Sequence, residues 1–252
     1  MDPTLLSSLL ILTAFLTSIL SAVFGMAGGL VLMGVYGSTL PVPAAMILHG
    51  TTQMFANGFR FVLLRSHALW PQFVAYLVGT AVAVGLFTVI ELTPSKSTLF
   101  IVMGLLPLIR FVPVPAAIMD FGRGRGATIC GLSVAAVQLL AGVAGPLLDL
   151  FFVRTNLKKH AVICNKALTQ TLSHFAKTAY FMAITGITGM NDVLTLPTVI
   201  GSIVAALVGT VVGAKLMQRL SEQRFRSITG HLVLGIGAIY LCKGIWLLIS
   251  AY

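Results

Sequence analysis

Two matched stripes of polar residues stand out in a chain that is otherwise strongly apolar. In the stretch HGTTQMFANGFR, steps of four, four and three residues separate His49, Gln53, Asn57 and Arg60. In the stretch KALTQTLSHFAK, the same steps separate Lys166, Gln170, His174 and Lys177. This spacing places each set on one face of an α-helix. The side chains are basic or neutral hydrogen-bonding groups, so the stripes predict a site that accepts an anion.

The composition of the chain places these stripes in a membrane. The chain has 252 residues, of which 58% are hydrophobic and only 9% are charged, whereas about a quarter of a soluble domain is charged. We therefore predict an all-α polytopic membrane protein. The net charge of +10 then reflects orientation in the membrane, with anion handling as a second explanation, and there is no nucleic-acid-binding motif.

The hydropathy pattern predicts ten apolar segments. They cover residues 4–24, 27–39, 43–64, 69–90, 97–112, 126–141, 144–153, 160–186, 194–218 and 228–250. Helices are expected throughout, because unpaired backbone groups cannot face lipid. Segments 27–39 and 144–153 are too short to cross the bilayer as straight helices, so we expect eight full spans plus short broken or re-entrant helices. Segment 4–24 is interpreted as a retained helix rather than a signal peptide.

The two halves of the chain resemble each other. A shift of 117 residues without a gap aligns Gly25, Ala27, Gly28 and Leu30 with Gly142, Ala144, Gly145 and Leu147. The same shift aligns the two polar stripes residue by residue, and LVGT at Leu77–Thr80 recurs at Leu207–Thr210. We predict one integral membrane domain made of a first repeat over 1–112, a basic connector over 113–125 and a second repeat over 126–252.

The distribution of charged loops favours repeats of opposite orientation. With five segments per repeat, one side of the membrane receives the basic connector and the basic loops near Arg65, Lys158 and Arg224. The other side receives mainly acidic residues, Asp2, Glu91 and Asp192. The positive-inside rule then predicts two inverted repeats, cytoplasmic basic loops and both termini outside.

A glycine-rich break precedes each polar stripe. The first break contains Gly25, Gly28 and Gly29, and the second contains Gly142 and Gly145. Glycine permits a turn inside the membrane, and a half-helix that begins there would point free N–H groups at an anion. Close helix packing through small residues is the competing explanation.

Ionisable residues inside a membrane are costly, so they are candidates for function. Arg60 and Lys166 lie near segment ends and could simply extend to the membrane surface. Asp149 has Leu32 as its counterpart in the first repeat, and an ion pair with Lys166 or Lys177 is the favoured explanation for it. Asp149, His49 and His174 are also candidates for carrying a coupling proton. The cysteines at 130, 164 and 242 lack metal-ligand spacing, so no metal site is predicted.

The breaks FGMAGGLVLMG and AGVAGPLLDLF, each followed by a helix rich in small and polar residues, resemble those of the sulfite exporter TauE/SafE family of membrane transporters. The resemblance extends over nearly the whole chain. It implies secondary transport of sulfite, an organosulfonate or a related carboxylate or sulfonate anion across the bacterial inner membrane, with no enzyme activity and no cofactor.

These observations together predict an alternating-access transporter for a small anion. The glycine breaks and both stripes would form the binding site between the repeats, and one repeat would rock against the other. An anion channel is the main alternative. An intramembrane enzyme is disfavoured because no nucleophile or metal motif is present, and a membrane scaffold would not need two polar stripes. The expected partners are the small anion and the lipid bilayer, and a homodimer is left open.

Overall fold

The computed structural model describes residues 2–24, 27–113, 118–153, 155–186, 194–217 and 222–251. These residues form ten α-helices and two short 3-10 helices, and no strand occurs among them. Gly25 and Asp192, which the sequence analysis singled out, lie outside the described residues. The all-helical prediction is confirmed for the part of the chain that the structure describes.

The helices follow the predicted segments closely. The first half contains α1 (Pro3–Phe24), α2 (Ala27–Thr39), α3 (Val42–Leu64), η1 (Arg65–His67), α4 (Trp70–Ile90), α5 (Lys96–Leu105) and η2 (Leu106–Phe111). The second half contains α6 (Gly124–Ala141), α7 (Gly145–Val153), α8 (Lys159–Thr185), α9 (Leu196–Met217) and α10 (Glu222–Ile249). Two differences stand out: α10 begins before residue 228, and the segment predicted at 97–112 divides into α5 and η2.

Local sequence explains where several helices begin and end. Proline lies in the first turn of α3 and of α4, where its missing N–H costs nothing. The Ser95 hydroxyl caps α5 by accepting a hydrogen bond from the Thr98 N–H at 3.1 Å. Pro107, near the start of η2, cannot donate to the preceding turn, which explains why α5 ends before it.

In the part of the chain that the structure describes, five helices are long and apolar enough to cross a membrane, by length and composition. They are α1, α4, α6, α9 and the part of α10 from Gly230 to Ile249. The chain is therefore a multi-pass membrane protein. By contrast, α2 has 13 residues and α7 has nine, so they extend only about 20 Å and about 14 Å at 1.5 Å per residue. Both are too short to cross about 30 Å of hydrocarbon as straight helices.

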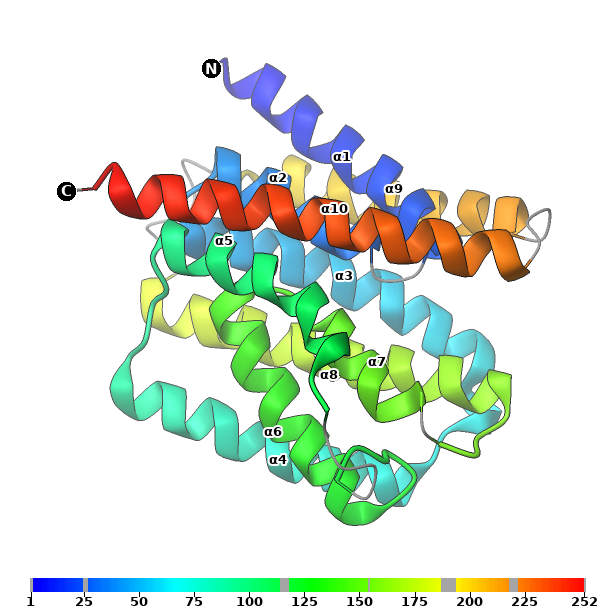
Figure 1. Ribbon diagram of the computed structural model, residues 1–252. Helices are drawn as coiled ribbons and strands as arrows, with labels where there is room; N and C mark the ends of the chain where they lie inside the picture. The colour runs from blue at the N-terminus through cyan, green and yellow to red at the C-terminus, as the bar shows by residue number, and fades with distance from the viewer. Residues whose placement is uncertain are drawn as a thin grey trace.

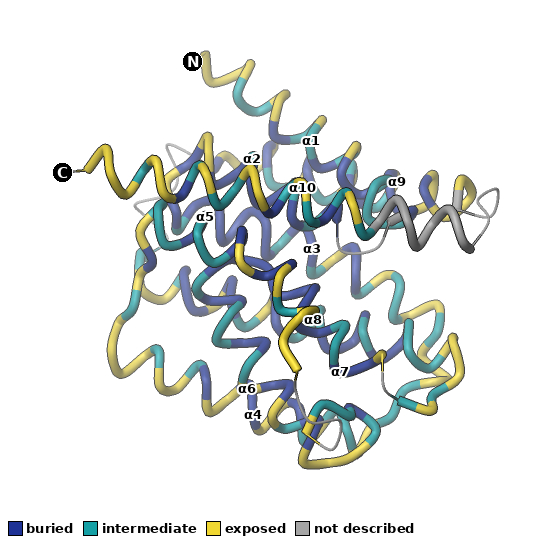
Figure 2. Tube along the Cα trace, viewed as in Figure 1, coloured by how far each residue is buried: buried dark blue, intermediate teal, exposed yellow. Residues whose placement is uncertain are grey.

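The helices pack in four principal pairs. α1 packs along α9, α4 packs along α6, α3 packs against α8, and α5 packs against α10 (Figure 1). α3 and α8 run antiparallel at the centre, because Gly50 faces Thr178 and Gly58 faces Thr171. Figure 2 shows buried residues concentrated in this central region and exposed ones along α4 and α10. Many exposed side chains there are large and apolar, such as Val89 and Ile249, as expected for surfaces that face lipid.

Glycine permits the closest of these helix contacts. A Cβ atom at Gly79 would lie 2.0 Å from the Thr128 carbonyl oxygen, and one at Gly131 would lie 2.0 Å from the Tyr76 carbonyl oxygen. α4 and α6 therefore meet backbone to backbone. Gly209 on α9 has the corresponding place, since its Cβ would lie 2.4 Å from the Phe15 carbonyl oxygen of α1. Gly79 and Gly209 are the glycines of the two LVGT motifs.

Several basic loops gather at one end of the molecule. Asn165, near the start of α8, accepts a hydrogen bond from the Leu69 N–H at 2.9 Å and donates one to the His67 carbonyl at 3.1 Å. The Gln72 amide donates to the Gly122 carbonyl, which joins the start of α4 to the connector. At the opposite end, the Tyr180 hydroxyl bonds to the Phe87 and Leu92 carbonyls. The start of α8, η1 and the connector therefore share one end, at the lower right of Figure 1.

Candidate functional site

A cavity of about 1360 Å³ lies between the two halves of the chain. Its wall is formed by α1, α2 and α3 from the first half and by the α6–α7 junction, α8 and α9 from the second. At one end the wall includes exposed residues at helix termini, namely Leu63 on α3, Lys159 on α8 and Lys215 on α9. The cavity is therefore accessible from the end that carries the basic loops.

The wall brings most of the predicted site residues together. Those on it are Gly29, His49, Gln53, Asn57, Arg60, Gly145, Lys166, Gln170 and His174. The two polar stripes thus face one shared space, to which α3 and α8 each contribute one face. Gly28, Gly142 and Lys177 are not on the wall, and Gly25 lies outside the described residues.

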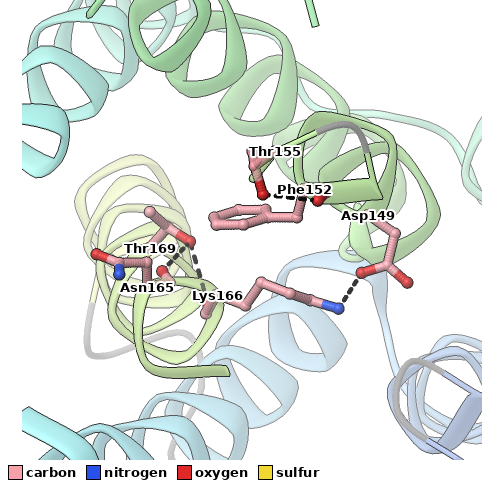
Figure 3. Close-up of polar contacts among 6 residues, drawn as sticks. All are labelled: Asp149, Phe152, Thr155, Asn165, Lys166 and Thr169. Carbon is pink, nitrogen blue, oxygen red and sulfur yellow. Dashed lines mark hydrogen bonds and ion pairs between the residues drawn. The ribbon is translucent and has the colours of Figure 1, made fainter. Parts of the chain in front are cut away.

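The charged side chains on the described cavity wall are all basic. They are Arg60, Lys159, Lys166 and Lys215, and no acidic residue belongs to the described wall. Asp149 lies behind the wall on α7 and forms an ion pair with Lys166. In Figure 3 the Lys166 side chain extends from α8 toward this carboxylate. The favoured prediction for Asp149, an ion pair with a lysine, is confirmed with Lys166 as the partner.

Hydrogen bonds around the ion pair fix the backbone on both sides. The Thr169 hydroxyl lies 2.8 Å from the Asn165 carbonyl and 3.1 Å from the Lys166 carbonyl, and donates toward both (Figure 3). On the other side, the Thr155 hydroxyl donates to the Phe152 carbonyl at 2.9 Å, which closes the end of α7. These bonds hold the turn of α8 that carries Lys166 and the helix end beyond Asp149.

Gln53 provides an unpaired donor on the wall. Its side chain is 6% exposed, and its Nε2 has no hydrogen-bond partner among the described residues. The neighbouring Asn57 amide is already engaged, since it donates to the Gln53 carbonyl oxygen at 2.9 Å. A buried amide without a partner costs about 1–3 kcal/mol, so Gln53 is suited to a ligand that accepts its hydrogen bond.

A second polar group lies at the inner end of the cavity, around His49. Its Nε2 is 3.1 Å from the Gly29 carbonyl oxygen, and its Nδ1 is 2.9 Å from the Lys177 Nζ. Lys177 also donates to the Gly142 carbonyl at 2.8 Å and is completely buried. Lys177 thus does not line the cavity. His49 lies on the wall and separates Lys177 from the cavity, with a hydrogen bond between the two side chains.

The glycines of the two breaks have different tasks. Gly142 ends α6 in the left-handed conformation, with φ of 73°, which favours glycine. Gly145 begins α7 at the cavity wall. A Cβ atom at Gly28 would lie 2.1 Å from the Thr17 carbonyl oxygen, so Gly28 serves helix packing. A Cβ atom at Gly29 would meet nothing within 4 Å. Helix packing therefore accounts for Gly28, whereas the anion-binding role of Gly29, which lies on the cavity wall, stays a prediction.

Sequence reasoning missed several residues of the wall. They are Ser18, Ser21, Gln138, Lys159, Thr210 and Lys215. Gln138 is buried, and its amide donates to His174 Nδ1 at 2.7 Å. A lone glutamine near the end of an apolar helix was the available signal. Lys215 lies near the end of an apolar segment, which is typical of a side chain that extends to the membrane surface, and the packing of α9 beside α3 brings it to the cavity.

The family comparison agrees with this geometry. A family profile described as sulfite exporter TauE/SafE matches residues 10–240. No curated protein and no solved structure gives a significant match. Because the profile covers most of the chain, including every helix that forms the cavity, the chain belongs to the sulfite exporter TauE/SafE family of membrane transporters.

Proposed function

We propose that the cavity is the binding site of an alternating-access transporter for a small oxyanion, such as sulfite or an organosulfonate. The family implies membrane transport of sulfite or a related anion, and the side chains of the cavity wall are of the types that bind an anion. The observation that carries the proposal is a wall with four basic side chains and no carboxylate among its described residues. In such a space of lowered dielectric constant, a bound anion is attracted strongly.

Three groups on the wall are available to bind the anion directly. Arg60 supplies a guanidinium whose planar donors match two oxygens of a sulfonate or sulfite. Gln53 supplies its unpaired Nε2 donor. The first turn of α7, beginning at Gly145, supplies backbone N–H groups and the positive end of a helix dipole. Gln170 and His174 complete the polar surface from α8.

The arrangement of helices supports two inverted repeats, residues 1–112 and 126–252. In the repeats, each helix of the first half corresponds to the helix five places later, so α1 corresponds to α6 and α4 to α9. The α1–α9 pair therefore corresponds to the α6–α4 pair, and both pairs pack closely. The same correspondence leaves the α3–α8 and α5–α10 pairs unchanged. The LVGT glycines also occupy equivalent crossings. Repeats of this kind let one bundle rock against the other around a central site.

Loop charges support an orientation in the bacterial inner membrane. The start of α8, η1 and the described part of the connector share one end of the molecule, and the positive-inside rule assigns that end to the cytoplasm. Both termini then lie outside. Because the cavity is accessible from the basic end, this orientation implies an inward-open state, and the proposed transport cycle requires a second state open to the opposite side.

Flux of radiolabelled sulfite into proteoliposomes tests the proposal. We expect saturable flux that ethanesulfonate inhibits and that Arg60→Gln reduces at least tenfold, since a hydrogen bond to a charged group contributes about 1.5–3 kcal/mol. Arg65→Gln is the matched control, because Arg65 is exposed in η1 and absent from the wall. Flux that never saturates would favour the channel alternative. Equal loss in both variants would refute the assignment of the site.

A further inference from the structure

A continuous hydrogen-bonded chain connects the two glycine breaks behind the cavity. It runs from the Gly29 carbonyl to His49, from His49 to Lys177, and from Lys177 to the Gly142 carbonyl, over contacts of 3.1, 2.9 and 2.8 Å. Gly29 lies in the first turn of α2, and Gly142 precedes α7. Lys177 and His49 thus hold both half-helices at once.

The tautomer of His49 follows from its partners. A carbonyl oxygen can only accept, so His49 Nε2 donates its hydrogen to Gly29, and a neutral ring then has a lone pair on Nδ1. Lys177 Nζ donates to that lone pair. Both hydrogen bonds of Lys177 can be made by an ammonium group and equally by a neutral amine, which retains two N–H groups. The pair can therefore gain or lose one proton without losing a hydrogen bond.

Among the described residues, no carboxylate forms an ion pair with Lys177 or His49. The partners of Lys177 are a carbonyl and an imidazole, although its side chain is completely buried. The residue aligned with His49 in the second half does have a carboxylate partner. Lys166, the counterpart of His49, is paired with Asp149, whereas the counterpart of Asp149 is the buried Leu32. Within the second half, Lys166 is thus neutralised by Asp149, whereas Lys177 has no carboxylate partner among the described residues.

We propose that Lys177 and His49 together form a proton-binding site whose counter-ion is the transported anion. This inference rests on the proposed function. His49 lies on the cavity wall and also touches Lys177, so an anion in the cavity stabilises the proton on the pair, and the proton in turn stabilises the anion. Charge also strengthens the hydrogen bonds that hold Gly29 and Gly142. Proton and anion therefore bind together and move in the same direction.

The other ionisable groups around the pair do not replace it. His174 on α8 is nearest, with its ring centroid 5.3 Å from that of His49, and it accepts from Gln138. Asp149 on α7 is engaged by Lys166. The other described ionisable groups on the two central helices are Arg60 on α3 and Lys159, His160, Cys164 and Tyr180 on α8. Those on the elements packed against these helices are Tyr36 on α2, Tyr76 and the terminal Glu91 of α4, Arg125 and Cys130 on α6, Lys215 on α9, and Arg65 and His67 in η1. None of them is hydrogen-bonded to Lys177.

Proton uptake on anion binding tests the proposal directly. The purified protein in detergent is held in a weakly buffered solution with a pH indicator, and ethanesulfonate is added. A sulfonate stays ionised throughout the range from about pH 6 to about pH 8, so any proton taken up enters the protein. We expect uptake approaching about one proton per anion bound, and an anion affinity that rises by up to about tenfold for each unit decrease in pH.

Two variants assign the proton to the pair. Lys177→Met removes the basic nitrogen but keeps a side chain of similar length, and we expect both proton uptake and pH dependence to be lost while weaker anion binding remains. His49→Gln can still donate to Gly29 and accept from Lys177, so it keeps the hydrogen-bonded chain without an imidazole, and we expect reduced uptake in a folded protein. Lys158→Met is the control, because Lys158 is exposed at the start of α8.

The outcomes separate this inference from the function on which it rests. Anion binding without proton uptake in the unmodified protein overturns the proton site and leaves the anion site standing. Unchanged uptake in Lys177→Met assigns the proton elsewhere and overturns the proposal as well. An absence of binding for both ethanesulfonate and sulfite overturns the proposed function and this inference together.

Discussion

At the scale of single residues, Gln53 is the most informative member of the cavity wall. It is buried and without a hydrogen-bond partner at Nε2, as is the Ser18 hydroxyl on the same wall, whereas His49, Asn57 and His174 are engaged. We expect a bound anion to accept the hydrogen bond that the Gln53 amide can donate. The sequence predicted Gln53 from its place in the stripe, but its lack of a partner depends on the surrounding packing.

Replacing Gln53 with leucine tests this role. Gln53→Leu keeps the approximate volume and removes a hydrogen bond to a charged ligand, so we expect anion affinity to fall by about 1.5–3 kcal/mol, or about tenfold to a hundredfold. Isothermal titration of ethanesulfonate into the purified protein measures the change. The melting temperature without anion should not decrease, because no internal hydrogen bond of that amide is lost. A lower melting temperature with unchanged affinity would show a purely structural role.

The ion pair between Asp149 and Lys166 predicts the opposite effect. Asp149→Asn releases Lys166, which already lies on the wall, so we expect anion affinity to increase by up to about tenfold. Titration at low and high salt measures this, and the increase should shrink as salt screens the charge. In the background of Lys166→Gln, Asp149→Asn should have little effect on affinity. Weaker binding in Asp149→Asn alone would contradict this interpretation.

At the scale of the helices, the sequence predicted most of what the structure shows. Each of the ten apolar segments corresponds to a helix, because lipid requires helical backbone, although α10 begins earlier than predicted and the segment at 97–112 divides into α5 and η2. The sequence could not predict which glycines contact a neighbouring helix. Gly28 and Gly29 are adjacent and identical in type, yet one faces the backbone of α1 and the other faces open space. That difference depends on how α2 is rotated against α1, which no local pattern determines.

The two glycines therefore provide a matched pair of substitutions. In Gly28→Ala the new methyl group would meet the Thr17 carbonyl at 2.1 Å, so we expect a loss of about 1–3 kcal/mol in stability from overpacking. In Gly29→Ala the methyl group has room, so we expect normal folding and altered anion affinity. Thermal unfolding in detergent and anion titration distinguish them. Equal stability of both variants would refute the packing role of Gly28.

At the scale of the whole molecule, two antiparallel helices, one from each half of the chain, line the centre of the cavity. α3 and α8 pack against each other at the centre, so the polar stripes of the two helices line the same cavity. The sequence predicted this sharing from the matched stripes. It did not predict that Lys177 would lie behind the wall, or that Gln138 and Lys215 would lie on it, because those positions depend on the rotation of α8 and on the neighbours of α6 and α9.

Access to the cavity from one end can be measured with cysteine labelling. In a Cys242→Ser background, since Cys242 is the exposed native cysteine, Leu63→Cys should react with a membrane-impermeant thiol reagent from the side of the basic loops. Ethanesulfonate should slow that reaction. Ser95→Cys, at the start of α5, should react only from the opposite side and without protection. Reaction of both cysteines from the same side would contradict the inward-open assignment.

Counterflow is the measurement that tests the central claim most directly. Proteoliposomes preloaded with unlabelled sulfite are diluted into a trace of radiolabelled sulfite, so that a carrier returning with a bound anion concentrates the label transiently inside. We predict such an overshoot for the unmodified protein and for Arg65→Gln, and its loss in Arg60→Gln. Label that only equilibrates, with no overshoot under preloading, would contradict an alternating-access carrier built around this cavity.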